Sequence, residues 1–202
     1  MLFRSDWRAY ERHVVGLQLA TGHDGIFFDN PTVHPQGCYC THCMAKFADF
    51  LKREEHVPVP DRSIEVVRSL ADRYPAAFAQ FRCTIARDFF EDMRRCARSI
   101  RPGALVTANN SLNSADALYV QCRTHAYNLA EMSRTEDFVV VEDMSSQPRV
   151  LSDGRVIEYG PTYRQIHSLI HGKPLVAVTI AEADYRTPPN LVRLALAEAA
   201  AN

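Results

Sequence analysis

The chain has 202 residues, 47% hydrophobic and 23% charged, and its 23 basic residues nearly balance 24 acidic ones to a formal net charge of -1. This composition predicts a soluble globular protein with one sizeable core, and the lack of a basic block argues against a nucleic-acid partner. No apolar run approaches the roughly 20 residues that span a bilayer, so no membrane segment is predicted. The six cysteines are expected to be reduced thiols, which favours a cytoplasmic location.

Apolar residues at steps of three and four predict three helices in the first half of the chain. The first covers residues 6–20 and ends at Gly22. The second covers residues 44–54 and is followed by a connection that contains two prolines. The third has the longest apolar stripe, covers residues 76–100 and stops at the sequence "RPG". Further helical patterns follow in the second half, at residues 115–132, at residues 163–170 and from Leu191 onward.

Four short apolar runs, "GIFFD", "ALVTANN", "FVVVED" and "PLVAVTI", predict strands between these helices. The runs lack polar alternation, and a helical pattern follows each of them. Both features are typical of a parallel sheet covered on both faces, so the predicted fold class is α/β. A doubly wound open sheet and a (β/α) barrel both fit this pattern. No glycine-rich phosphate loop follows any of the strands, which argues against a nucleotide-binding fold.

The ends of the predicted strands carry acids and amides. In a (β/α) barrel the carboxyl ends of the strands line the mouth of the active site. The residues at or shortly after these ends are Asp29, Asn30, Asn109, Asn110, Glu142, Asp143 and Glu182.

Four strands make about half of an eight-unit barrel, which typically takes about 250 residues. We therefore interpret residues 1–202 as the C-terminal half of a partial (β/α)8 TIM barrel with about four βα units. A complete, small four-stranded α/β domain is the alternative. A half-barrel on its own leaves two open sheet edges and an uncovered core face, so we expect the isolated chain to be inactive and to associate with itself as a homo-oligomer.

Three cysteines follow the first predicted strand in the spacing C-x-C-x-x-C. A short turn can bring the thiolates of Cys38, Cys40 and Cys43 within the roughly 2.3 Å at which zinc binds sulfur. Three reduced loop thiols without a metal are the alternative. The fourth ligand stays open, because His34 and His42 are near in sequence but a further cysteine would better suit a closed structural site.

The segment from Gly22 to Leu51, with "DGIFFDNP", "CYCTHC" and "FADFL", resembles the stretch after the fourth strand of family 42 glycoside hydrolases, the barrel β-galactosidases. It resembles still more closely the hypothetical glycosyl hydrolase group related to them. The resemblance implies a glycosidase barrel whose cysteine-rich loop, residues 31–43 here, holds zinc together with a fourth, upstream cysteine. Family 42 places its acid/base glutamate directly after "DN". This chain has Pro31 there, so that residue does not carry over.

Glycosidic cleavage usually needs two carboxyl groups that flank the scissile bond. Asp29 and Glu142 each end an apolar run directly, and by resemblance to α-galactosidase-like barrels they form the favoured catalytic pair. Family 42 instead pairs its fourth strand with its seventh, which implies Glu182 as the partner of Asp29. Each acid also fits a helix N-cap or a loop acceptor.

The expected sugar contacts are polar side chains beside these acids, since an amide both donates and accepts hydrogen bonds. The leading hypothesis from the sequence is an O-glycosyl hydrolase that acts on a carbohydrate and carries a structural zinc ion. A barrel that binds sugar without catalysis and a zinc-stabilised interaction module are the alternatives. The expected sugar contacts are Asn30, Asn109, Asn110 and Asp143.

Overall fold

The computed structural model divides the chain into two compact units. The first unit is made of residues 1–26, 32–104 and 120–128, and the second of residues 27–31, 105–119 and 129–202. Within the part of the chain that is described, every helix is too short or too polar to cross a lipid bilayer. The described residues are 5–29, 33, 38–110, 115–143, 153–155, 158–179 and 189–202.

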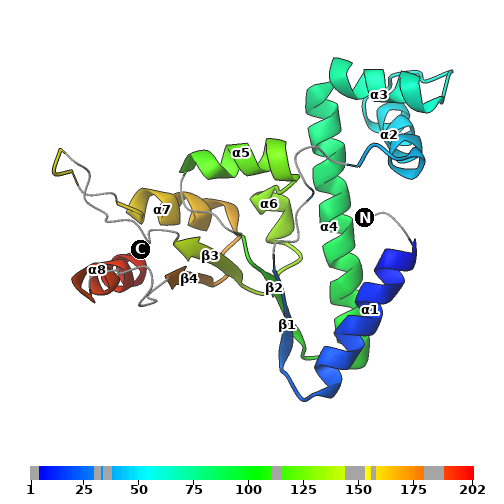
Figure 1. Ribbon diagram of the computed structural model, residues 1–202. Coiled ribbons are helices and arrows are strands. Elements are labelled where there is room, and N and C mark those ends of the chain that lie inside the picture. Colours follow the sequence, from blue (N-terminus) through cyan, green and yellow to red (C-terminus); the bar gives the residue numbers. More distant parts are fainter. Residues whose placement is uncertain are drawn as a thin grey trace. The chain divides into compact units, whose positions relative to one another are not determined.

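The predicted order of helices and strands is confirmed, and the fold is α/β (Figure 1). Each predicted strand and each long predicted helix has a counterpart in the structure. Gly22, at φ 95°, ends the first helix in a conformation that glycine adopts easily. The elements are α1 (Ser5–Ala20), β1 (Gly25–Phe28), α2 (Thr41–Glu54), α3 (Ile64–Arg73), α4 (Pro75–Ile100), β2 (Leu105–Ala108), α5 (Ala115–His125), α6 (Leu129–Met132), β3 (Val139–Asp143), α7 (Gly160–Leu169), β4 (Leu175–Thr179) and α8 (Pro189–Ala201).

Two predictions about helices are wrong. The proline-containing connection after α2 includes helix α3, whose Val67 and Ala71 are buried against the first unit's core. The helical pattern over residues 115–132 is two helices, α5 and α6, separated at residues 126–128. Ala126 has φ 59° at this break, a conformation rare for a residue with a side chain, and it is buried there. Neither glycine nor proline marks the break in the sequence.

The core of the first unit lies where α2, α3 and α4 meet. Phe47 of α2 is fully buried, and its ring centroid lies 5.0 Å from that of Phe78 and 5.2 Å from that of Phe81, both on α4. The two α4 residues lie one turn apart on the apolar stripe that the sequence predicts, so a single face of α4 receives α2. Cys43 and Met44, one turn before Phe47, belong to the same buried cluster.

Helix α1 packs along α4 and is held by an ion-pair network around Asp92 (Figure 1). Arg12 binds both carboxylate oxygens of Asp92, at 2.7 and 2.6 Å, and Arg8 binds Oδ2 at 3.2 Å. Burial raises the pKa of the Asp92 carboxyl, but hydrogen bonds and positive charge from Arg12 and Arg8 lower it more, so this pKa lies below its usual value. The network therefore stabilises the ionised form of Asp92.

Replacing Asp92 with Asn is expected to destabilise the first unit by about 2 kcal/mol near pH 7, less than a fully buried pair would lose, because Arg12 is half-exposed. A lowered folded-state pKa contributes stability above the unfolded-state value of about 3.9, and this stability is lost as the pH falls through the folded-state value. The gap in unfolding free energy between the two proteins should therefore be constant near neutral pH and shrink below about pH 4.

Urea unfolding at a series of pH values measures this gap. Asp88→Asn is the matched control, because Asp88 is an exposed acid on the same helix that forms an ion pair with its neighbour Arg87. This substitution should cost less than about 0.5 kcal/mol. A gap that does not change with pH would show that the carboxylate charge of Asp92 is not what stabilises the helix pair.

The strands of the second unit follow one another in chain order. β1 pairs with β2, and β3 pairs with β4 in parallel, with Val139 opposite Leu175 and Val141 opposite Ala177. A parallel bridge between Asn109 and Val140 joins the end of β2 to β3. The parallel pair β3 and β4, with helix α7 between them in the chain, has the pattern of a βαβ unit.

The described strands carry exposed apolar side chains, although a parallel sheet is normally covered on both faces. On β4, Leu175 and Ala177 face helices α7 and α8, whereas Val176 and Val178 are each 42% exposed. Phe27 of β1 is 52% exposed in the same unit. Apolar side chains of strands normally lie in a core, so this exposed face needs a cover that the described residues do not supply.

Candidate functional site

Asp29 and Asn109 meet directly after strands β1 and β2. Asp29 is exposed, and Asn109 is 6% exposed. The side-chain amide of Asn109 donates a hydrogen bond to Oδ1 of Asp29 at 3.0 Å, and its backbone N–H donates to the carbonyl oxygen of Phe28 at 2.9 Å. The bridge from Asn109 to Val140 fixes the asparagine to a third strand. The structure thus presents one carboxylate oxygen in a defined position at the end of the sheet.

Asn110 lies deeper than its neighbour and has a different set of contacts. Only 2% of its surface is exposed, and its amide nitrogen donates to the carbonyl oxygen of Val140 at 2.8 Å and to Oε2 of Glu136 at 3.2 Å. These bonds connect β2 to β3 inside the unit. The role of Asn110 as a sugar contact therefore stays a prediction, one that this geometry does not support.

Glu136 is a fully buried acid that the sequence analysis missed. It precedes β3, and besides the bond from Asn110 to its carboxylate, its backbone carbonyl accepts a hydrogen bond from the ammonium group of Lys173. The same ammonium group donates to the carbonyl of Ser133 and so holds the chain that follows α6. No local sequence pattern distinguishes Glu136 from the neighbouring acids, because its partners come from distant elements.

The other predicted site residues are only partly described. The backbones of Glu142 and Asp143 end β3 in register with Val178 and Thr179 of β4, and nothing is described of the two acids' side chains. The pairing of Asp29 with a second carboxylate therefore stays a prediction. Asn30 and Glu182 lie outside the described residues.

The sulfur atoms of Cys38, Cys40 and Cys43, here called the cysteine cluster, lie within 4.8 Å of one another. The Sγ atoms of Cys40 and Cys43 are 3.4 Å apart. Cys40 is the N-cap residue of α2, and its carbonyl oxygen accepts the N–H of Met44 at 3.0 Å, so the first turn of the helix sets the spacing of two of the sulfurs. Cys43 is buried in the aromatic core.

The first turn of α2 also sets the protonation of the cluster. Burial raises the pKa of Cys40, but hydrogen bonds from the Cys43 backbone and from the thiol of Cys38 outweigh it and lower the pKa to about 7. Burial raises the pKa of Cys43 well above its usual value, and its neighbours Cys38 and Cys40 add to that rise. Of these two thiols, Cys40 is therefore the more readily ionised.

The donor set of the cluster fits a metal ion that prefers thiolates. Tetrahedral zinc with sulfur ligands at roughly 2.3 Å needs sulfurs somewhat under about 4 Å apart, a spacing that small side-chain rotations would give here. Among the described residues, no fourth Cys, His, Asp or Glu joins this group, and His42 is not part of it. His34, the other nearby histidine, lies outside the described residues.

Arg82 of α4 holds Val33, a residue that precedes the cluster in the chain. It is 6% exposed, and its guanidinium donates hydrogen bonds to the carbonyl oxygens of Val33 at 3.2 Å and Thr124 at 3.4 Å. Val33 in turn donates its N–H to the carbonyl oxygen of His125 at 2.9 Å. The C-terminal turn of α5 and one arginine of α4 thus both hold Val33, five residues before Cys38.

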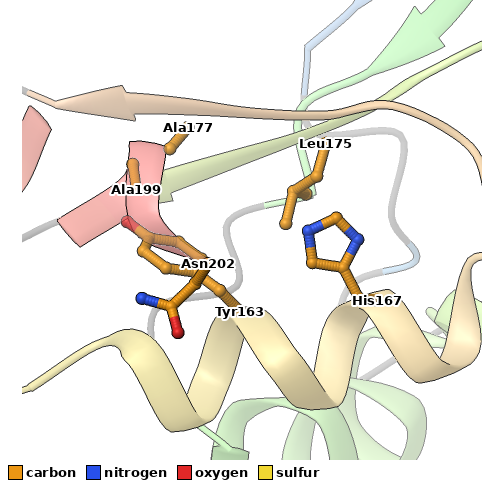
Figure 2. A pocket seen from close by; sticks show the side chains of 6 residues that line it. All are labelled: Tyr163, His167, Leu175, Ala177, Ala199 and Asn202. Atoms are coloured by element: carbon orange, nitrogen blue, oxygen red, sulfur yellow. The ribbon is translucent and has the colours of Figure 1, made fainter. Parts of the chain in front are cut away.

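The second unit has a small cavity between β4, α7 and α8, shown in Figure 2. Its volume is about 40 Å³, and Figure 2 shows that His167 and Tyr163 reach it from α7. This volume accommodates water molecules, whereas sites for organic ligands are several hundred Å³ in size. It is therefore too small for a sugar. The lining residues are Tyr163, His167, Leu175, Ala177, Ala199 and Asn202.

No family model matches the chain, and no curated protein matches its sequence. Among solved structures, the chain is similar to the PgaB (BpsB) glycoside hydrolase domain from Bordetella bronchiseptica, with a TM-score of 0.56 and 14% sequence identity. The similarity covers 96% of this chain and 62% of that one. At this identity the likeness concerns the fold, and the chain spans less than two thirds of the length of the glycoside hydrolase domain that it matches.

Proposed function

We propose that the chain forms part of a glycoside hydrolase barrel and that Asp29 is one of its two catalytic carboxyl groups. The observation that carries the proposal is the hydrogen bond between Asn109 and Asp29 at the ends of two neighbouring strands. A glycosidase needs a carboxyl group held in position and open to solvent, where substrate can approach. The fold similarity to a glycoside hydrolase domain supports the same chemistry.

The barrel itself belongs to the proposal. The sequential order of the four strands is compatible with a (β/α) barrel. Further strands of a closed barrel would cover the exposed apolar side chains of Phe27, Val176 and Val178. The similar glycoside hydrolase domain is longer than this chain. Residues 1–202 would then form the second half of the barrel, related to the family 42 enzymes through the cysteine-rich loop.

The second carboxyl group is Glu142 or Glu182 in this proposal, with Asn30 and Asp143 as further sugar contacts. Glu142 is favoured because its backbone lies at the end of β3, which is bridged to Asn109 and so belongs to the same set of paired strands as Asp29. In its ionised form the second group would attack the anomeric carbon or activate water, while the first protonates the leaving oxygen. The cysteine cluster would hold zinc for structural reasons, because three thiolates describe a closed site.

Asp29→Asn in the full-length protein is expected to lower kcat by at least about 100-fold, because the amide cannot transfer a proton or attack carbon. Hydrolysis of a panel of nitrophenyl glycosides measures kcat, and calorimetric titration with the best substrate's sugar measures binding, which should change little. Asp24→Asn is the matched control, since Asp24 is an acid with a fully exposed side chain just before the same strand. That variant should keep both properties.

The outcomes separate the proposal from its alternatives. Full activity in the Asp29→Asn protein would remove Asp29 from the mechanism. A wild-type protein that binds oligosaccharides and cleaves none of them would instead be a sugar-binding barrel. A protein that neither binds nor cleaves sugars would favour the zinc-stabilised interaction module.

A further inference from the structure

Two cysteines of the first unit lie against each other outside the cysteine cluster. Cys83 is on α4 and Cys122 is on α5, 39 residues further along the chain. Their Sγ atoms are 3.7 Å apart, and the thiol of Cys83 also lies 3.6 Å from the carbonyl oxygen of Cys122. Both side chains are thiols in the structure. Two sulfurs in van der Waals contact need only side-chain rotation and a small backbone adjustment to reach the roughly 2.05 Å of a disulfide.

The two thiols differ in their access to solvent. Cys83 is 1% exposed and faces α5, whereas Cys122 is partly exposed. A small oxidant therefore reaches Cys122 first, and Cys83 is the only one of the two that is fully enclosed. Reversible oxidation to a disulfide requires an accessible thiol and a second thiol in contact with it, and Cys122 and Cys83 are arranged in this way.

We propose that Cys83 and Cys122 are a reversible oxidation site whose oxidant is a hydroperoxide. In the first step the sulfur of Cys122 attacks one oxygen of the peroxide, and the O–O bond breaks. With hydrogen peroxide this step gives a sulfenic acid on Cys122 and one water molecule. In the second step the sulfur of Cys83 attacks the sulfenic sulfur, the S–O bond breaks, and a second water molecule leaves. The two thiols lose two electrons and two protons in total, and one peroxide molecule is reduced to two water molecules.

The disulfide would act on the segment that carries the cysteine cluster. Cys122 lies two residues before Thr124 and three before His125, whose carbonyl oxygens accept hydrogen bonds from Arg82 and Val33, and Cys83 is adjacent to Arg82 in α4. A covalent bond between Cys83 and Cys122 would therefore fix α5 to α4 at the point where both helices hold Val33. Oxidation would stiffen this anchor without involving the cluster's own sulfurs.

The full-length protein is first reduced, freed of reductant and treated with hydrogen peroxide. It is then unfolded in the presence of N-ethylmaleimide, digested and analysed by mass spectrometry. We expect a peptide pair joined through Cys83 and Cys122, with a mass about 2 Da below the sum of the two thiol peptides, that disappears on reduction. Cys122→Ser should abolish the pair, and Cys96→Ser, a cysteine of α4 outside both groups, should keep it. In Cys83→Ser, dimedone should label Cys122, because the sulfenic acid then has no thiol to attack it.

A thermal melt gives a second measurement. Oxidation should raise the Tm by about 5 °C or more in the wild-type and Cys96→Ser proteins and leave it unchanged in Cys122→Ser. The proposal is overturned if the folded protein, checked by circular dichroism, yields Cys83 and Cys122 fully alkylated after peroxide treatment. Oxidation confined to the cysteine cluster or to Cys96 would overturn it as well.

Discussion

Removing the zinc ion proposed for the cysteine cluster is expected to destabilise the full-length protein by on the order of 5 kcal/mol. Structural zinc stabilises small domains by about 10 kcal/mol or more. The expected loss is smaller here because the aromatic core would keep part of the fold around α2 without the metal. The cysteine cluster joins the β1–α2 loop to the first turn of α2, so loss of the metal would release the loop from the start of the helix. Elemental analysis should give about one zinc per chain, and chelation should lower the urea midpoint and the activity together.

Cys40→Ser should reproduce the effect of the chelator, because it removes one metal ligand, whereas serine is itself a favoured N-cap residue and should not weaken the start of α2. Cys96→Ser is the matched control, since Cys96 lies on α4 away from the cluster and should keep both zinc and stability. A metal-free protein with unchanged stability and activity would refute a structural zinc site. Activity lost on chelation while the fold persists would assign the metal to catalysis instead.

Local periodicity was sufficient to predict most of the fold. The apolar stripe of α4 and the unbroken apolar runs of the strands are set by the side chains themselves, so helix, strand and the α/β class follow from the sequence. Helix α3 was missed because the prolines before it suggested a connection. The break at Ala126 was missed because a buried alanine with positive φ carries no local signal and is imposed by tertiary packing.

In the candidate site, too, residues with a local signal could be predicted, and contacts between distant elements could not. Position at a strand end was enough to select Asp29 and Asn109, and the structure brings these two side chains together. Spacing alone was enough to select the three cysteines of the cluster. Asn110 contacts Glu136, 26 residues further along the chain, and Cys83 contacts Cys122, 39 residues further along. No pattern within one element predicts such contacts.

The aromatic core beneath the cysteine cluster should be as important as the metal. Phe47→Ala is expected to lower the free energy of unfolding by about 3–5 kcal/mol, because a fully buried ring is lost and a cavity is left among Phe50, Phe78 and Phe81. Part of the cost is the loss of ring-to-ring contacts, including the edge-on pair with Phe78. Phe47→Leu, which keeps most of the apolar volume, should cost clearly less.

Urea unfolding of the zinc-loaded protein measures these losses. Leu17→Ala is the control, because Leu17 is 56% exposed on α1 and its truncation should change the free energy of unfolding by less than about 0.5 kcal/mol. A loss from Phe47→Ala no larger than this control would show that the ring does not stabilise the unit.

The same variant tests whether core and metal site form one cooperative unit. Cys43 lies one turn before Phe47 on α2 and is buried in the same cluster, so a loosened α2 should hold its sulfur less precisely. Phe47→Ala should therefore also weaken zinc binding, and its destabilisation should not simply add to that of Cys40→Ser, because residues that share a packed unit couple energetically. Additive free energies and unchanged zinc affinity would instead mean that the loop positions the metal without help from the helix core.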